Sequence, residues 1–482
     1  IKAEIELLLT NKGPSISEFA TDIQLDQGVM ISGYWLNIGS EKVAGKIFEK
    51  KAAMWVYHMI RDFTRRDPGI LIYKNQTAAQ LSVYPFEANQ SRTTGIELLY
   101  PAGLNPSIIV GSKQVALYND QLSPSQQIML ANNDESTVAF VPAPVLQQLP
   151  AVQRKPYIHF IVDKSLKARK SFDTFAKTMS DIAEKYSPTD QCKITFANYD
   201  SSDVNVFVAI NEIENAVKSP ASKSITFEGA FCYSNIIKQK LLEFKDKNAS
   251  CDNLDVPVFV VIKAPDSNSV ALGQMAPFGQ ITPDIQKYYI ALKDGMFDAI
   301  GFDGKQTIVE RIESADSSIL FKYGSSYAIC VKDSNFAIAK FPSTEKNVLE
   351  VYEPARNTFF EINDVKPLAD DSTYEKGLAL WNKYNESIYY PYKAETQLPE
   401  IVKMSKESGI MVPATSYMVV ENSSQQEILK RKEKQSLNAN QAYEFDEYME
   451  SPAPSILFIA PIALFLLHKI KRRHNLTSNL IK

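Results

Sequence analysis

The chain has 482 residues, of which 45% are hydrophobic and 22% charged, and its formal net charge is −4. These values are ordinary for a globular protein and leave room for two or three domains, so a sizeable core can form. A slightly acidic chain without a basic patch outside its C-terminal tail is not typical of a nucleic-acid-binding protein. We therefore expect no nucleic acid among its partners.

Cysteine and histidine are too sparse to indicate a metal centre or a disulfide scaffold. The four cysteines occur singly, without a C-x-x-C pair, and one bridge between Cys232 and Cys251 stays open as an alternative. None of the H-E-x-x-H, G-x-S-x-G, Walker or G-x-G-x-x-G motifs occurs in its proper context. We expect no catalytic residues and no cofactor, so the protein is predicted not to be an enzyme.

Residues 1–104 are predicted to form a β-rich domain with one helix. Strand-like runs lie on both sides of a helical pattern that begins at Glu49, with apolar residues at the spacing of an amphipathic helix. Asp67-Pro68-Gly69 ends that helix. Glu49 and Lys50 either form a site or cap the helix start, where a carboxylate suits the helix dipole, and we expect capping.

This block resembles the VIT domain, which stands at the front of inter-alpha-trypsin-inhibitor heavy chains and of many bacterial proteins. The resemblance covers about residues 4–101. It rests on Gly45, Glu49-Lys50, Ala53, Tyr57, Asp67-Pro68-Gly69 followed by Ile70-Leu71, and Val83-Tyr84-Pro85-Phe86.

Residues 105–152 are rich in Ser, Pro, Gln and Asn and are predicted to be a linker with one or two short strands. From 153 to 275, short apolar runs alternate with amphipathic helical patterns, which predicts a doubly wound α/β sheet. Chemistry in such sheets gathers at the carboxyl ends of the strands, so Asp163 and Asp266 are the candidate positions. His159 lies inside the first strand and is expected to be a core residue with its hydrogen bonds satisfied.

This second block resembles the von Willebrand factor A (vWA) domain, the usual neighbour of VIT. That family holds Mg²⁺ with Asp-x-Ser-x-Ser, a Thr on a middle loop and an Asp after a later strand. Here Asp163-Lys-Ser165 is followed by Leu and Lys167, and the middle loop from Glu228 to Asn235 has no Thr at the expected place. Asp163, Ser165 and Asp266 would supply three ligands at most, and Lys167 brings a cation instead. We expect a degenerate, metal-free vWA-like domain, with a weakened Mg²⁺ site as the alternative.

Residues 276–420 are predicted to be a β-rich module with helices, because short apolar runs recur between Gly, Asp and Ser turns. The stretch 409–421 resembles the segment that closes the vWA-adjacent region in VIT proteins. Residues 421–451 are polar and charged, show no core pattern beyond a possible short helix, and are predicted to be an extended spacer to a membrane.

The tail, residues 452–474, has the layout of a membrane-spanning segment. An acidic stretch at 444–450 precedes the charge-free run Ile456–Leu467. That run spans about 18 Å as a helix, against a bilayer core of about 30 Å. The cluster formed by Lys469, Lys471, Arg472 and Arg473 follows and is expected to stay in the cytoplasm, so the bulk of the chain is predicted to lie outside it. A short core helix or an interfacial anchor is the alternative.

The same layout resembles the C-terminal sorting signals of bacterial exosortase systems, which combine a short Pro-containing motif, a hydrophobic helix and an Arg-rich end. The motif position reads Met449-Glu450-Ser451-Pro452, without the usual Pro-Glu-Pro core. The resemblance implies a membrane-embedded processing enzyme as partner, cutting near Ser451 and Pro452. Because the chain opens at Ile1 without a signal peptide, we expect it to be part of a longer, exported protein.

Taken together, the chain resembles the VIT-domain proteins dedicated to a bacterial exosortase variant, exosortase N. The expected function is that of a non-catalytic, membrane- or surface-anchored protein-interaction protein exposed outside the cytoplasm. One alternative is a permanently anchored accessory subunit of the sorting machinery. Another is an adhesion protein whose vWA-like domain binds ligands through a divalent cation.

Overall fold

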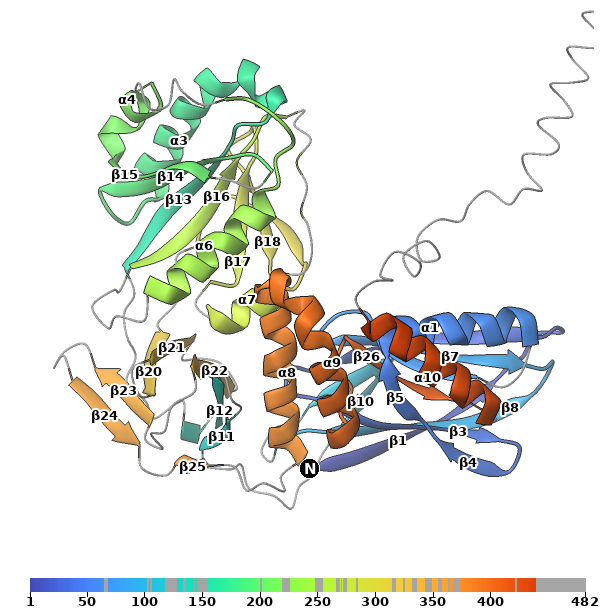
Figure 1. The fold of residues 1–482 in the computed structure, drawn as a ribbon. Coiled ribbons are helices and arrows are strands. Elements are labelled where there is room, and N and C mark those ends of the chain that lie inside the picture. Colours follow the sequence, from blue (N-terminus) through green and yellow to red (C-terminus); the bar gives the residue numbers. More distant parts are fainter. Residues whose placement is uncertain are drawn as a thin grey trace, which may run out of the picture.

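The computed structural model shows a mixed α/β protein with several β-sheets (Figure 1). It describes residues 1–64, 68–101, 104, 106–117, 128–132, 136–142, 144–145, 155–199, 202–218, 226–247, 255–265, 269, 271, 275–282, 285–313, 318–323, 326–331, 336–342, 349–353, 358–362, 365–367, 373–420 and 423–438. Asp266, Met449–Pro452, Lys469 and Lys471–Arg473 lie outside these ranges. Within them, no helix is long and apolar enough to cross a membrane.

The N-terminal unit is a sandwich of two antiparallel sheets that enclose one apolar core. Strand β1 alternates exposed charges with inward Ile5, Leu7 and Leu9, as a sheet with one buried face requires. The first sheet runs β1 (Lys2–Thr10), β8 (Ser91–Leu99), β3 (Met30–Ile38), β4 (Glu41–Ala44). The second runs β10 (Lys113–Ala116), β9 (Ser107–Val110), β2 (Ser17–Leu25), β7 (Ala78–Phe86), β6 (Gly69–Tyr73), β26 (Thr415–Val419), β5 (Lys46–Glu49).

Two helices cover the outer face of the second sheet. Helix α1 (Lys50–Met59) buries Ala52, Ala53, Val56 and Tyr57 and runs into a π-helical turn, Ile60–Thr64. Helix α10 (Ser423–Leu437) lies across α1 (Figure 1). Its Leu429 side chain is fully buried in the apolar cluster that also contains the buried side chains of α1. The prediction of an extended spacer from residue 421 is therefore wrong for 423–437, which form a docked helix.

The C-terminal strand β26 is part of the N-terminal sandwich, where it lies between β6 and β5. Thr415 pairs with Glu49 on one side, and Ser416 pairs with Ile72 on the other. Strands β9 and β10 also belong to this unit. The predicted boundary at residue 104 is wrong because the second sheet needs residues 107–116 and 415–419 to be complete.

The α/β unit confirms the predicted alternation of strands and helices, with helices on both faces of one sheet. The sheet runs β15 (Ser202–Ala209), β14 (Gln191–Ala197), β13 (Lys155–Asp163), β16 (Asp255–Ile262), β17 (Lys287–Ala291), β18 (Phe297–Gly301), β19 (Gln306–Val309), and the four from β14 to β17 are parallel. One face carries α3 (Phe172–Tyr186) and α4 (Ile213–Val217), and the other carries α6 (Tyr233–Lys247) and α7 (Ala276–Ile281). The predicted boundary at residue 275 is wrong because α7 and three strands beyond it complete this unit.

Two smaller sheets make up the third part of the chain. One joins β11 (Ile128–Asn132), β12 (Ser136–Pro142), β22 (Phe336–Pro342) and β25 (Val365–Pro367), and the other joins β20 (Ser318–Tyr323), β21 (Ser326–Val331), β23 (Leu349–Glu353) and β24 (Thr358–Ile362). The predicted linker therefore supplies two strands, β11 and β12, to a sheet whose other strands lie some 200 residues further along the chain.

A helical hairpin, α8 (Thr373–Tyr389) and α9 (Pro391–Ser408), stands between all three parts (Figure 1). Near its start, the Tyr374 hydroxyl donates to the Gly28 carbonyl of the sandwich at 3.1 Å. The Tyr374 ring packs edge-on against Phe140 of β12. At its other end, the Tyr389 hydroxyl donates to the Pro277 carbonyl of α7 at 2.6 Å. One helix thus fixes the three parts together.

Candidate ligand-binding face of the α/β unit

The candidate site lies at the carboxyl ends of β13 and β14, where Asp163 is fully buried. One Asp163 carboxylate oxygen, Oδ1, accepts the Ser165 backbone N–H at 2.7 Å. The other, Oδ2, accepts the Ala264 backbone N–H after β16 at 3.3 Å. The Asp163 carboxylate therefore ties the ends of two neighbouring strands together through charge-assisted hydrogen bonds, which is a structural role.

The loop that precedes α6, after α4, crosses this end of the sheet. The Glu228 N–H donates to the Lys164 carbonyl, and the Cys232 N–H donates to the Asn198 carbonyl. Gly229, at φ +66°, lies so close to the Tyr199 ring that an added Cβ would be 2.9 Å from Cδ1. The loop is therefore held by backbone contacts and needs glycine at this position.

The donor set fits Mg²⁺ poorly. Magnesium requires near-octahedral oxygen ligands, and both Asp163 oxygens already accept backbone N–H groups. In the described ranges, Ser165 Oγ and Asn198 Oδ1 are buried and have no hydrogen-bond partner, but both are neutral. No group of three or more His, Cys, Asp or Glu side chains in those ranges is placed to hold a metal ion. Because Asp266 is not among them, the metal-free site stays a prediction.

Around Asp163 the surface carries large apolar side chains and several cations, together with the exposed Glu228 of the crossing loop. Leu166 is 63% exposed and Tyr199 is 50% exposed, although both side chains are large and hydrophobic. The short 3-10 helix Leu166–Lys170 also exposes Lys167, Arg169 and Lys170. Exposed aromatic and aliphatic side chains beside positive charge are typical of protein-binding surfaces. We call Leu166, Tyr199, Arg169 and Lys170 the carboxyl-edge face.

Two predictions about single residues are confirmed. His159 is buried, and its Nε2 lies 2.9 Å from Thr195 Oγ1. Glu49 caps α1, because its carboxylate accepts the Lys51 and Ala52 N–H groups at 2.9 and 2.8 Å. The structure brings Asp163 and Ser165 together at the sheet edge and places Glu49 in a separate unit.

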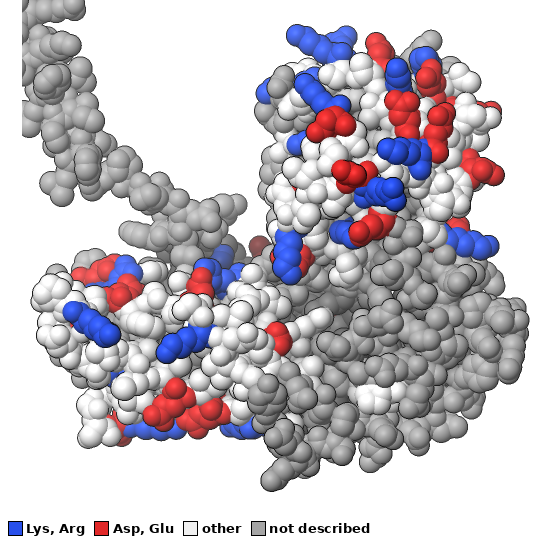
Figure 2. Space-filling view, turned by 180° about the vertical axis from the view of Figure 1, so that it is seen from behind, with Lys and Arg blue, Asp and Glu red and all other residues white. Residues whose placement is uncertain are grey.

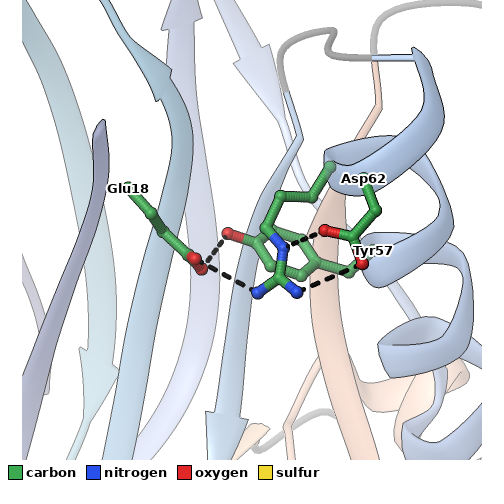
Figure 3. Close-up of polar contacts among 4 residues, drawn as sticks. Glu18, Tyr57 and Asp62 are labelled. Atoms are coloured by element: carbon green, nitrogen blue, oxygen red, sulfur yellow. Dashed lines mark hydrogen bonds and ion pairs between the residues drawn. The ribbon is translucent and has the colours of Figure 1, made fainter. Parts of the chain in front are cut away.

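The sequence reasoning missed a polar cluster at the C-terminal end of α1 (Figure 3). The Tyr57 hydroxyl donates to Glu18 of β2 at 2.7 Å, and Arg61 bridges Glu18 and Asp62 at 3.2 and 2.7 Å. Burial, together with the Glu18 carboxylate, raises the pKa of Tyr57 far above its usual value, so the hydroxyl stays a donor. Because the partners Glu18 and Tyr57 are 39 residues apart, the local sequence carries no signal for this contact.

Positive and negative side chains alternate over the face of the α/β unit that Figure 2 shows. This mixed charge matches the low net charge of the chain and offers no uniform field to a polyanion on that face. Comparisons of the chain with protein-family models and with curated proteins found no match.

Proposed function

We propose that the protein is a non-catalytic interaction protein, held at a membrane by its C-terminal tail, with the carboxyl-edge face as its contact surface. The observation that carries this proposal is the exposure of Leu166 and Tyr199 next to a buried, backbone-capped Asp163. A carboxylate engaged in this way does not need an ion, and the large apolar side chains beside it can anchor a partner. The resemblances to VIT and vWA domains favour the same role.

The chemistry of the face favours an acidic partner segment. Arg169 and Lys170 are exposed on the same 3-10 helix as Leu166. Positive charges at the rim of a contact steer an acidic partner toward it, while the central aromatic residue supplies most of the affinity. The proposal therefore combines Tyr199 as the anchor with Arg169 and Lys170 as the rim.

Site-specific photo-crosslinking in the native cells tests this face. A photoreactive phenylalanine analogue at position 199, which keeps an aromatic ring there, is expected to capture a protein partner equally well with Mg²⁺ and with a chelator present. The same residue at Ile308, which is 62% exposed on β19 of the same unit, is the matched control. Leu166→Asp is expected to abolish capture from position 199. Capture that requires Mg²⁺ would instead favour the cation-dependent alternative, and equal capture from 308 would rule out this face.

For the tail, we propose sorting by an exosortase-like enzyme at Met449–Pro452. Helix α10 ends at Leu437, and the 11 residues between it and Met449 span at most about 40 Å when extended. If Met449 lies at the membrane surface, the C-terminal end of α10 is then at most about 40 Å from it.

The mass of the C-terminal peptide from native cells is the measurement that tests sorting. We expect mature chains to end near Ser451 or Pro452 and to lack Ile456–Leu467, because the enzyme removes the apolar run. Recovery of peptides from His474–Lys482 in the membrane fraction would contradict cleavage. That result would favour the alternative of a permanently anchored accessory subunit.

A further inference from the structure

A second surface lies on the outer helical layer of the sandwich, where α10 packs against α1 (Figure 1). The exposed side of α10 carries three cations, Lys430, Arg431 and Lys434, and one carboxylate, Glu427. The other carboxylate of this helix, Glu433, is buried and already forms an ion pair. We call Lys430, Arg431 and Lys434 the basic stripe. It lies on a chain whose formal net charge is −4, so positive charge is concentrated at this place.

The three cations of the basic stripe lack partners within the part of the chain that the structure describes. None of them forms an ion pair, a side-chain hydrogen bond or a cation–π contact there. Lys430 comes four residues before Lys434 and Arg431 three, so their like charges lie on one side of the helix and repel one another. An anionic partner on this side removes that repulsion.

Helix α1 adds a cation and a large aromatic side chain to the same layer. It contains no Asp or Glu, and Lys51 is exposed in its first turn. Trp55 is half-buried against the apolar cluster beneath the two helices, and the Lys432 ammonium of α10 lies 4.1 Å from the centre of its ring. An exposed carboxylate that follows α1, Asp62, is paired with Arg61 at 2.7 Å. Tryptophan beside basic side chains is typical of surfaces that lie at the headgroup level of a bilayer.

The chain that follows α10 connects this layer to the proposed membrane segment. The 18 residues from Asn438 to Ser455 lie between α10 and the apolar run that begins at Ile456, and they span at most about 65 Å when extended. A membrane segment in that run keeps the basic stripe within reach of the bilayer surface in every molecule, at a high effective concentration. A contact through a few charges, which is weak between free molecules, is then sufficient. In this respect the inference rests on the proposed membrane attachment.

We propose that the basic stripe, together with Lys51 and Trp55, docks the sandwich on the headgroups of a bilayer that contains anionic phospholipids. The lipid phosphates accept hydrogen bonds from the unpaired cations, and the Trp55 ring lies at the headgroup level. Such a surface spreads its negative charge over a plane, so it fits a row of exposed cations without a fixed geometry. The tether favours a bilayer over an acidic protein, because it brings the bilayer and no particular protein to this layer.

Co-sedimentation of the full-length chain with phospholipid vesicles tests the proposal. A Gly/Ser sequence of equal length replaces residues 456–474, because the apolar run would insert by itself and the basic cluster at 469–473 would itself bind anionic lipid. We expect binding to phosphatidylcholine vesicles with about 30% phosphatidylglycerol to be at least about 100-fold tighter than to phosphatidylcholine alone. Each cation at an anionic surface contributes about fivefold to this difference. About 0.5 M NaCl is expected to abolish it, because salt screens exposed charges.

Two variants with the same change of net charge locate the contact. The test variant neutralises the basic stripe in one chain, by Lys430→Gln, Arg431→Gln and Lys434→Gln. The control variant neutralises exposed lysines outside α1 and α10, by Lys12→Gln, Lys113→Gln and Lys177→Gln. The test variant is expected to reduce the difference between the two kinds of vesicle to less than about tenfold, and the control variant is expected to keep it.

Three results would overturn the proposal. One is equal binding to both kinds of vesicle, and another is an equal loss in the two variants. The last is binding that begins only after the carboxylates of residues 444–450 are changed to amides, which would make this acidic stretch the occupant of the basic stripe. The vesicle experiment uses a chain without the apolar run, whereas the C-terminal mass is measured on the native chain, so this inference and the proposed sorting fail separately.

Discussion

A fragment of residues 1–117 is expected not to fold alone, and to fold once residues 409–438 are joined to it. Without β26, strand β6 loses one of its two neighbours, and the edge strand β5 loses its partner in the sheet. The core loses Met411, Tyr417 and Val419 on its inner side and Met418 and Leu429 on its outer side. Five buried side chains at about 2 kcal/mol each amount to roughly 10 kcal/mol, which equals the whole stability of a typical domain.

Circular dichroism and proton NMR dispersion of three chains would measure this effect. They are residues 1–117, the same fragment joined by a Gly/Ser linker to 409–438, and a matched version in which Met411, Tyr417 and Val419 are Ser. Only the second is expected to give dispersed amide signals and one cooperative unfolding transition. A cooperative transition of 1–117 by itself would show that β26 is dispensable.

The local patterns predicted the elements better than they predicted the units. The helix start at Glu49 and the strand that ends at Asp163 were found because each has a short-range signal, a cap and an apolar run. The place of β26 was not found, because its partners Glu49 and Ile72 are more than 340 residues away. The residue pattern of a strand does not indicate which distant strand it pairs with.

Helix α10 has a pattern that predicts a spacer although the segment is a docked helix. Of its residues, Leu429 is fully buried, while Lys430, Arg431 and Lys434 are exposed, so the apolar stripe is too narrow to stand out. Polar contacts supply the rest of the docking energy, including the Lys432 ammonium 4.1 Å from the centre of the Trp55 ring. Contacts of this kind depend on the residues of α1 that face α10, so they cannot be predicted from the sequence of α10 alone.

The candidate site could be predicted only in part, because its contacts join residues that are far apart in the sequence. The sequence placed Asp163 and Ser165 at a strand end, and the structure places them there. The sequence does not show that the Ala264 N–H, 101 residues further along the chain and just after β16, donates to the Asp163 carboxylate. Nor could it give the exposure of Tyr199, which depends on the loop through Gly229.

Glu49→Ala is expected to lower the free energy of unfolding of the sandwich by about 3 kcal/mol, the cost of losing a helix cap and leaving buried donors unpaired. The Glu49 carboxylate is buried and joins both helices of the outer layer. It accepts two N–H groups of α1, and Ser436 of α10 donates to it at 2.7 Å. The Glu49 N–H in turn donates to Glu433, which also accepts from Lys406 at 2.5 Å.

Urea unfolding followed by tryptophan fluorescence measures this loss in the sandwich itself. Trp35 and Trp55 lie in that unit, and the third tryptophan, Trp381, packs on Tyr73 of β6. Ser436→Ala removes one of the contacts and is expected to cost about 1 kcal/mol. Glu41→Ala, at an exposed position of β4, is the control and is expected to cost less than about 0.5 kcal/mol. If Glu49→Ala unfolds at the same urea concentration as Glu41→Ala, the Glu49 carboxylate does not couple the two helices.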